Sequence, residues 1–199
     1  MTHAGIYGVE TSEKTLENLY GIDIDYYARI NFTSFLNLID AIGGVTVYND
    51  QAFTSLHGNY DFEVGDITLN SDEALGFVRE RYSLDNGDYD RGKNQLKVIQ
   101  AIINKLTSFS SISNYSSIMS TLQDSVQTDM PLDTMMDLAN TQLDSGKKFT
   151  ITSQEVTGTG STGELTSYAM PTASLYMIQL DDASVASASQ AIKDVMEGK

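Results

Sequence analysis

The arginines of this 199-residue chain are unevenly distributed. There are only four, and Arg79, Arg81 and Arg91 fall within thirteen residues of one another. Residues 79–97 carry five cationic and four acidic side chains, whereas the rest of the chain carries seven cations and twenty-three acids. Because a planar guanidinium binds phosphate oxygens bidentately, this segment is a candidate anion site. The alternative is that the arginines only pair with neighbouring carboxylates at the surface, which contributes little to stability.

Two further polar residues strengthen the phosphate hypothesis. A long amphipathic helix is predicted to begin near Arg91, and Gln95 lies four residues later, on the same helical face. The start of a helix also presents unpaired N–H groups and the positive end of its dipole to an anion. Asp88 lies three residues before Arg91 and could either orient its guanidinium group or accept a proton.

The preceding helix must end in the right place for the arginine pair to act together. It is predicted to begin with Ser71 as its N-cap, after a loop over residues 49–70. Arg79 and Arg81 are two positions apart, so a helix would point them to different sides, whereas an extended chain would point them to one. We therefore predict that this helix ends near Val78.

The elements before this region predict the fold class. Apolar and polar side chains alternate over residues 22–32, which indicates a half-buried strand. A helix carrying the apolar residues of segment 35–42 follows and ends at Gly43-Gly44, and residues 45–48 form a short strand. Strand, helix and strand within about thirty residues are typical of a βαβ unit, so the sequence predicts an α/β layered fold.

The last ninety residues are predicted to alternate between helices and strands. Helices are predicted over residues 115–123, 132–143 and 183–196, and strands over 149–156 and 175–180. The glycine-rich stretch 158–163 lacks the Gly-Lys-Ser/Thr ending of a phosphate-binding P-loop and is predicted to be a flexible turn. No linker or internal repeat divides the chain, so residues 1–199 are predicted to form a single domain.

Composition excludes several classes of function. The formal net charge is −15, which argues against an extended nucleic-acid surface, because phosphate backbones are bound by clustered Lys and Arg. There is no cysteine, which excludes disulfides, thiolate metal sites and cysteine nucleophiles. No run of 18 apolar residues is present, so any membrane anchor is expected outside this chain.

Three segments, in order, resemble the LytR-CpsA-Psr family. They are residues 40–45 (DAIGGV), 70–81 (NSDEALGFVRER) and 87–95 (GDYDRGKNQ). Residues 2–8 (THAGIYG) and 31–35 (NFTSF) are similar to its capsular-polysaccharide, CpsA-type branch. The resemblance extends over nearly the whole chain, and an ordered series of motifs is more specific than any one of them.

The resemblance implies an α/β/α sandwich with a mixed central sheet flanked by helices. It also implies a phosphotransferase, anchored outside the cytoplasmic membrane, that attaches a polyprenyl-diphosphate-linked glycopolymer, here capsular polysaccharide, to peptidoglycan. In the family, the residues that match Arg79, Arg81, Arg91 and Gln95 bind the diphosphate. Asp88 and Arg91 are then the expected catalytic pair, and Phe35, Ile39, Val98 and Ile102 are candidates for lining a groove for the isoprenoid tail, although each could equally be plain core.

The chain departs from the family pattern at the start of the domain. The strands that normally open the domain, with magnesium-binding aspartates and further pocket arginines, are absent, and the chain resembles the C-terminal two-thirds of the domain. Mg²⁺ is therefore expected to take its ligands from the missing segment, with no metal ligand in this chain. The fragment is expected to be inactive alone.

Two other functions remain open. The same arginine clamp with water as nucleophile would make a polyprenyl-diphosphate pyrophosphatase, and acceptor identity cannot be deduced from these residues. A non-catalytic module that binds or senses a lipid diphosphate is the third hypothesis. Direct DNA binding by such a module is disfavoured by the acidic charge.

Overall fold

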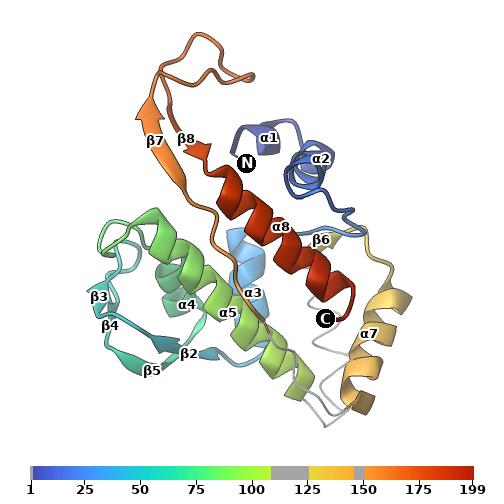
Figure 1. Ribbon diagram of the computed structural model, residues 1–199. Helices are drawn as coiled ribbons and strands as arrows, with labels where there is room; N and C mark the ends of the chain where they lie inside the picture. Colours follow the sequence, from blue (N-terminus) through green and yellow to red (C-terminus); the bar gives the residue numbers. More distant parts are fainter. Residues whose placement is uncertain (1, 109–125, 146–150) are drawn as a thin grey trace. The chain divides into compact units, whose positions relative to one another are not determined.

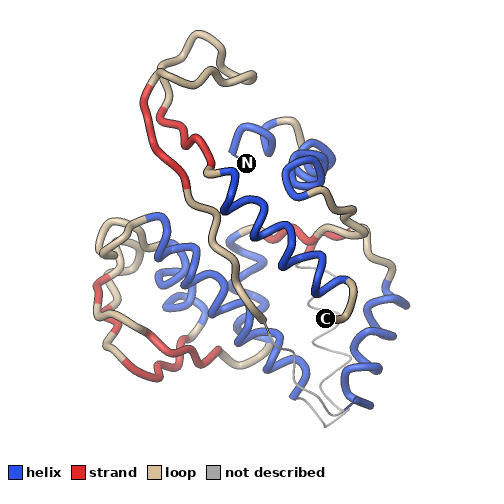
Figure 2. Tube along the Cα trace, in the orientation of Figure 1, coloured by secondary structure: helices blue, strands red, loops and turns tan. Residues whose placement is uncertain are grey.

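The computed structural model describes residues 2–108, 126–145 and 151–199 (Figure 1). Contacts along the chain define two compact units, residues 1–27 with 152–199, and residues 28–151. Each unit combines helices with strands (Figure 2), which confirms the predicted α/β class. The single domain over residues 1–199 stays a prediction. The helix predicted over residues 115–123 lies outside the described residues, as do the first two residues of the strand predicted over 149–156. The prediction was wrong for the rest of that strand, because residues 151–156 form no strand.

The unit of residues 28–151 contains the arginine-rich segment. Its elements are β1 (Ala28–Ile30), α3 (Phe32–Ala41), β2 (Val45–Asn49), β3 (Phe53–Thr54), β4 (Asp61–Phe62), β5 (Gly65–Leu69), α4 (Ser71–Arg79), α5 (Asp88–Ser108), β6 (Val126–Thr128) and α7 (Leu132–Ser145). The described strands pair antiparallel, β1 with β6, β2 with β5 and β3 with β4. Every sheet of the described residues therefore has two strands.

This pairing corrects the predicted βαβ unit. The strand before α3 and the strand after it do not pair with each other, because each is hydrogen-bonded to a different, antiparallel partner. The strand predicted over residues 22–32 is confined to residues 28–30, and the predicted loop over 49–70 contains three short strands. The family resemblance implied a mixed central sheet, whereas the described sheets are antiparallel. Alternation of polar and apolar residues predicts exposure along a strand, but it does not select the strand's partner.

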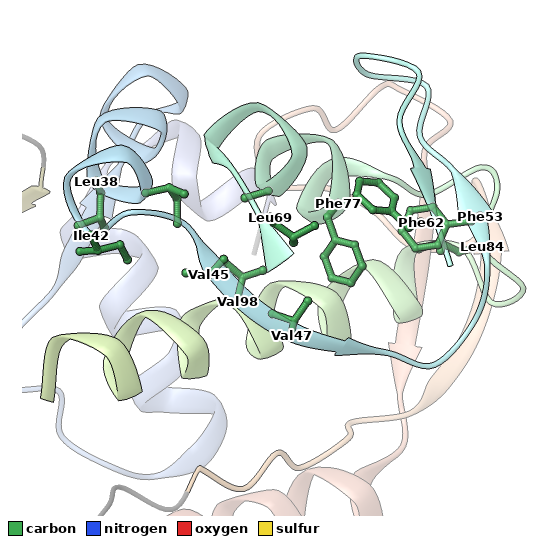
Figure 3. Close-up of a cluster of buried hydrophobic side chains, with 12 residues drawn as sticks. Leu38, Ile42, Val45, Val47, Phe53, Phe62, Leu69, Phe77, Leu84 and Val98 are labelled. Carbon is green, nitrogen blue, oxygen red and sulfur yellow. The ribbon is translucent and has the colours of Figure 1, made fainter. Parts of the chain in front are cut away.

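The core of this unit lies where α3, α4 and α5 pack against β2 (Figure 3). Val45 and Val47 of β2 are buried, while the residues between and after them are exposed, as expected for one covered face. Phe77 of α4 is fully buried, and its ring centroid lies 5.5 Å from that of Phe53 and 5.3 Å from that of Phe62. These aromatic contacts hold the C-terminal half of α4 against the β3–β4 hairpin.

The turn between α3 and β2 depends on its two glycines. Gly43 and Gly44 both have positive φ, at 70° and 80°, which residues with a side chain rarely adopt. A Cβ on Gly44 would also lie 2.7 Å from the carbonyl oxygen of Leu69. The predicted end of the helix at this glycine pair is confirmed.

The second unit contains α1 (Thr2–Ile6), α2 (Val9–Tyr20), β7 (Gly158–Thr162), β8 (Tyr176–Leu180) and α8 (Asp182–Met196). The prediction of a flexible turn at residues 158–163 was wrong, since β7 pairs antiparallel with β8. A glycine is needed at position 160 of β7, because a Cβ on Gly160 would collide with the ring of Tyr176 on β8. None of the described helices is long and apolar enough to cross a membrane.

Candidate functional site

The arginine pair is carried by the end of α4. This helix begins with a capping box, in which Asn70 rather than Ser71 accepts a hydrogen bond from the N–H of Glu73, and the Glu73 carboxylate accepts one from the N–H of Asn70. The helix ends at Arg79, one residue later than predicted, and Glu80 is extended. Arg79 and Arg81 therefore flank the single residue at which the chain leaves the helix.

Arg79 has two neighbours from other elements. Its guanidinium carbon lies 4.5 Å above the centre of the Phe32 ring, at the start of α3. Its Nη1 lies 3.3 Å from Nδ1 of His57, in the loop between β3 and β4. A cation above an aromatic face is attracted by the ring quadrupole. These contacts hold one guanidinium group at the place where three elements meet.

Arg81 and Arg91 have more local surroundings. Arg81 is exposed, with its guanidinium carbon 5.4 Å from the centre of the neighbouring Tyr82 ring. Arg91 forms an ion pair with Asp88 one turn earlier in α5. The helix begins at Asp88 rather than near Arg91, so both partners lie in its first turn. Since both side chains are partly exposed, this pair contributes little to stability and mainly fixes the direction of the guanidinium.

Gln95 connects the two helices of the site. Its Nε2 donates a hydrogen bond of 3.2 Å to the carbonyl oxygen of Val78. That carbonyl lies in the last turn of α4, where helical carbonyls lack partners within the helix. Gln95 therefore fixes α5 against the turn that carries Arg79.

A cavity of about 460 Å³ adjoins Arg79. It is lined mainly by aliphatic and aromatic side chains of α3, α4 and α5, together with residues of β1 and of β6. Arg79 and Gln95 contribute to its wall, whereas Arg81, Asp88 and Arg91 do not. The structure thus places two of the four predicted diphosphate-binding residues at an apolar cavity, and the other two, together with the predicted catalytic residue Asp88, outside its wall.

The predicted lipid-lining residues divide in a similar way. Phe35, Val98 and Ile102 line the cavity. Ile39 does not, because it lies on the buried side of α3 and is fully enclosed in the core. Helical periodicity places all four on apolar faces, but it does not separate residues that face a cavity from residues packed on all sides.

Among the residues near this cavity that the sequence did not single out, three bear on the surroundings of Arg79. Arg29 of β1 and Phe32 belong to its lining, and His57 contacts Arg79. Arg29 could have been suspected, as it is the only arginine outside the cluster. His57 gave no signal in the sequence, because its contact with Arg79 spans 22 residues and depends on the β3–β4 hairpin.

Two buried carboxylates stabilise the segment around the arginines. Glu80 accepts hydrogen bonds from four backbone N–H groups, and Asp90 accepts from the N–H and side-chain amide of Asn86 and from Gln51. Burial by itself would raise the pKa of each carboxyl group, but these hydrogen bonds outweigh burial, and the pKa of both is lowered. For Asp90, Lys93 also favours the charged form. Both groups are therefore charged at neutral pH.

The described residues do not fit a magnesium site. They contain no group of three or more His, Asp or Glu side chains that could hold a metal ion. Near the arginines, Asp88 is paired with Arg91, and Asp90 is occupied by amide groups and Lys93. The involvement of Mg²⁺ stays a prediction.

The LytR_cpsA_psr family model matches residues 2–184. This range includes the two arginine-containing motifs, residues 70–81 and 87–95. The chain belongs to the LytR_cpsA_psr family. It is 40% identical over 158 residues to the polyisoprenyl-teichoic acid–peptidoglycan teichoic acid transferase TagU of Oceanobacillus iheyensis, covering 79% of this chain and 48% of TagU. The chain spans about half the length of the curated relatives it matches.

Solved structures share this fold. The crystal structure of Bacillus subtilis TagU is similar with a TM-score of 0.72 and 29% identity, covering 96% of this chain and 74% of that one. The structure of TagT bound to LIIa-WTA gives a TM-score of 0.73 and 25% identity, with 97% and 70% covered. The match to these structures over nearly the whole chain shows that the family assignment extends to both compact units.

Proposed function

We propose that the protein is a phosphotransferase that attaches a polyprenyl-diphosphate-linked glycopolymer to peptidoglycan, and that this chain carries part of its lipid-diphosphate site. The observation that carries the proposal is a guanidinium group, Arg79, at the wall of an apolar cavity of about 460 Å³. A ligand with an anionic head and a hydrocarbon tail is complementary to both. The TagU relatives are named as transferases of polyisoprenyl-linked teichoic acid to peptidoglycan, which supports the same substrate class.

The cavity is the proposed site of the isoprenoid chain. Burial of hydrocarbon contributes about 0.8 kcal/mol per CH₂ group, so a few isoprene units supply most of the affinity. Phe35, Val98 and Ile102 would contact the tail, and Gln95 would help to keep α4 and α5 together around it. The head group would then lie at Arg79, with Arg29 as a second cation of the same wall.

The arginines supply electrostatic stabilisation in the proposed reaction. A sugar hydroxyl of peptidoglycan attacks the phosphorus attached to the glycopolymer, the bond from that phosphorus to the bridging oxygen breaks, and polyprenyl phosphate leaves. The hydroxyl proton passes to a base. Negative charge grows on the leaving and non-bridging oxygens, where Arg79, Arg81 and Arg91 would stabilise it. Asp88 orients Arg91 through their ion pair, and we propose it as the base as well.

Capsular polysaccharide is the cargo that we propose, on the resemblance to the CpsA-type branch. The TagU relatives carry teichoic acid in their names, so the common chemistry is a sugar phosphate polymer on a polyprenyl carrier. Peptidoglycan lies outside the cytoplasmic membrane, and we propose that the protein acts there, next to the membrane that contains the carrier lipid.

Binding of short lipid analogues tests the site. Calorimetry with farnesyl diphosphate, pyrophosphate and farnesol is expected to rank farnesyl diphosphate as the tightest ligand. Arg79→Ala should weaken its binding at least tenfold, since a hydrogen bond to a charged group contributes about 1.5–3 kcal/mol. Lys97→Ala removes the same charge from a residue that pairs with Asp50 and does not line the cavity, and it should have little effect. Equal loss in both variants would refute the site.

The transfer step needs its own assay. The full-length protein should release polyprenyl phosphate faster when a peptidoglycan acceptor is added, and the glycopolymer should become attached to that acceptor. Equal rates with and without acceptor, with phosphate-capped glycopolymer as product, would instead show a pyrophosphatase. Tight binding without turnover would show a binding or regulatory module.

A further inference from the structure

Glu80 lies between the two arginines and is almost completely buried. Only 3% of its surface is exposed, while Arg79 and Arg81 on either side are exposed. A carboxylate in such a place is costly unless its oxygens are fully hydrogen-bonded. A buried charge within the Arg-Glu-Arg sequence therefore calls for a structural explanation.

The hydrogen bonds of Glu80 supply that explanation. Its Oε1 accepts three bonds from successive backbone N–H groups, those of Arg81 at 2.9 Å, Tyr82 at 2.7 Å and Ser83 at 2.9 Å. The other oxygen, Oε2, accepts a bond of 2.6 Å from the N–H of Leu56. One side chain thus fixes the backbone just after the helix and connects it to the β3–β4 loop.

The same loop also contacts Arg79. His57 follows Leu56 directly, and its ring contacts the Arg79 guanidinium. The loop is closed internally by Ser55, whose hydroxyl donates to the carbonyl of His57 at 2.8 Å and accepts from the N–H of Tyr60 at 3.2 Å. Movement of Glu80 would therefore release both the backbone that carries the arginines and the loop that contacts Arg79.

We propose that Glu80 is a positioning residue for the arginine pair, and that its buried carboxylate fixes the backbone and the β3–β4 loop from which the two guanidinium groups are aimed. The proposal deepens the proposed function and rests on it for the identity of the ligand. The lowered pKa of this carboxyl group, in which hydrogen bonds outweigh burial, agrees with an acceptor that is charged at neutral pH.

The chemistry of the contact requires glutamate. Glutamine keeps the shape but replaces one oxygen with an NH₂ group, which would face a backbone N–H. Aspartate keeps the charge, but it is one methylene shorter and cannot reach Leu56 and the three following amides together. Both substitutions are expected to loosen the segment, and neither removes an arginine.

The test compares Glu80→Gln with Glu73→Gln in the whole 199-residue chain. Glu73 lies at the other end of the same helix, where its carboxylate caps the N-terminus, so the matched substitution destabilises α4 without touching the arginines. With only four arginines in the chain, their Nε–H signals can be resolved by NMR and assigned from single Arg→Lys variants. Relaxation of these signals reports the order of each guanidinium group directly.

We expect the Arg79 signal to lose order in Glu80→Gln and in Glu80→Asp, and to keep it in Glu73→Gln. Farnesyl diphosphate should bind about tenfold more weakly to Glu80→Gln, at a temperature where every variant is folded, and within twofold of the native affinity to Glu73→Gln. Unchanged order and affinity in Glu80→Gln would overturn the proposal, and equal losses in both variants would reduce Glu80 to a general stabilising role.

Failure of the proposed function is distinguishable from failure of this inference. If the native chain does not bind farnesyl diphosphate, the assignment of the ligand is wrong. The NMR comparison then still decides the role of Glu80, because it needs no ligand. Loss of Arg79 order that is specific to the Glu80 variants would support positioning, and its absence would refute it. Should Glu80→Gln fail to fold, the same readout on Glu80→Asp replaces it.

Discussion

Nη1 of Arg79 lies 3.3 Å from Nδ1 of His57, although the two residues are 22 positions apart. An arginine side chain can only donate hydrogen bonds, so Nδ1 of His57 is the acceptor. The bond connects the end of α4 with the β3–β4 loop, and it leaves the other guanidinium nitrogens for a ligand. His57 therefore restricts the position of Arg79 without neutralising its charge.

Removal of this contact should weaken ligand binding modestly. His57→Ala is expected to lower the affinity for farnesyl diphosphate two- to fivefold, which corresponds to about 0.5–1 kcal/mol for one lost hydrogen bond. Calorimetry measures the change. His3→Ala is the control, since His3 contacts Ser167 in the other compact unit. An affinity unaffected by His57→Ala would show that Arg79 is positioned by other contacts alone.

Filling the cavity should separate tail binding from head-group binding. Ile99 of α5 lines the cavity and is 48% exposed, and Ile99→Trp should lower the affinity for farnesyl diphosphate at least tenfold while that for pyrophosphate stays unchanged. Leu96→Trp provides the matched control, because Leu96 lies on the same helix with 40% exposure but outside the cavity. If both variants bind farnesyl diphosphate equally well, the tail lies elsewhere.

The lowered pKa values of Glu80 and Asp90 predict a loss of stability in acid. As the pH falls below about 4, the unfolded chain takes up these protons before the folded chain does, so protons favour unfolding. The two carboxylates therefore stabilise the folded chain at pH values above about 4, and this stabilisation is lost as the pH falls through their folded pKa values. Urea unfolding between pH 7 and pH 3 measures this.

Glu80→Gln should alter that pH dependence in a specific way. It is expected to lower the free energy of unfolding at pH 7 and to reduce its slope with pH in acid by up to one proton, about 1.4 kcal/mol per pH unit. Glu63→Gln, at an exposed loop position, is the comparison. An acid slope that Glu80→Gln leaves unchanged would show that this carboxylate does not contribute to acid unfolding.

A close approach between α4 and the β3–β4 loop gives a prediction about stability. A Cβ on Gly76 would lie 3.0 Å from the carbonyl oxygen of His57 and 3.0 Å from Oγ of Ser55. Gly76→Ala should therefore destabilise the protein by about 1–3 kcal/mol, the usual cost of overpacking. It should also lower the order of Arg79, because the displaced loop carries His57.

A second helical glycine provides the control for this substitution. Gly92 of α5 has open space where a Cβ would be, so Gly92→Ala should stabilise the protein by about 0.5–1 kcal/mol through helix propensity. Denaturant unfolding of both variants is the measurement. Stabilisation by Gly76→Ala would show that the loop yields without cost.

Local patterns in the sequence were sufficient to predict α3, α4, α5, α7 and α8, whereas α1 was not predicted. Residues 71–79 form a helix because a capping box starts it and an apolar stripe buries it, and both signals are encoded within ten residues. The end of α3 at Gly43-Gly44 and the Asp181 cap of α8 are equally local. The family motifs are also local, and the comparison with known proteins confirms the family they indicate.

The pairing of the strands could not be predicted from local patterns in the sequence. β1 pairs with β6, about one hundred residues later, and β7 pairs with β8 although it is built from Gly, Ser and Thr. Strand propensity describes how a residue fits a pleated surface, and it depends on the partner strand. The predicted βαβ unit failed because periodicity contains no information about that partner.

The sequence by itself determined that a cluster of arginines would lie at and after the end of one helix, because residue type, spacing and caps act over a few positions. Only the tertiary structure decided that Arg79 meets Phe32, His57 and an apolar cavity, while Arg81 and Arg91 lie outside its wall. These relationships arise where hydrophobic burial brings distant segments together. That force is non-directional, so the identity of the partners is set by the packing of the whole unit.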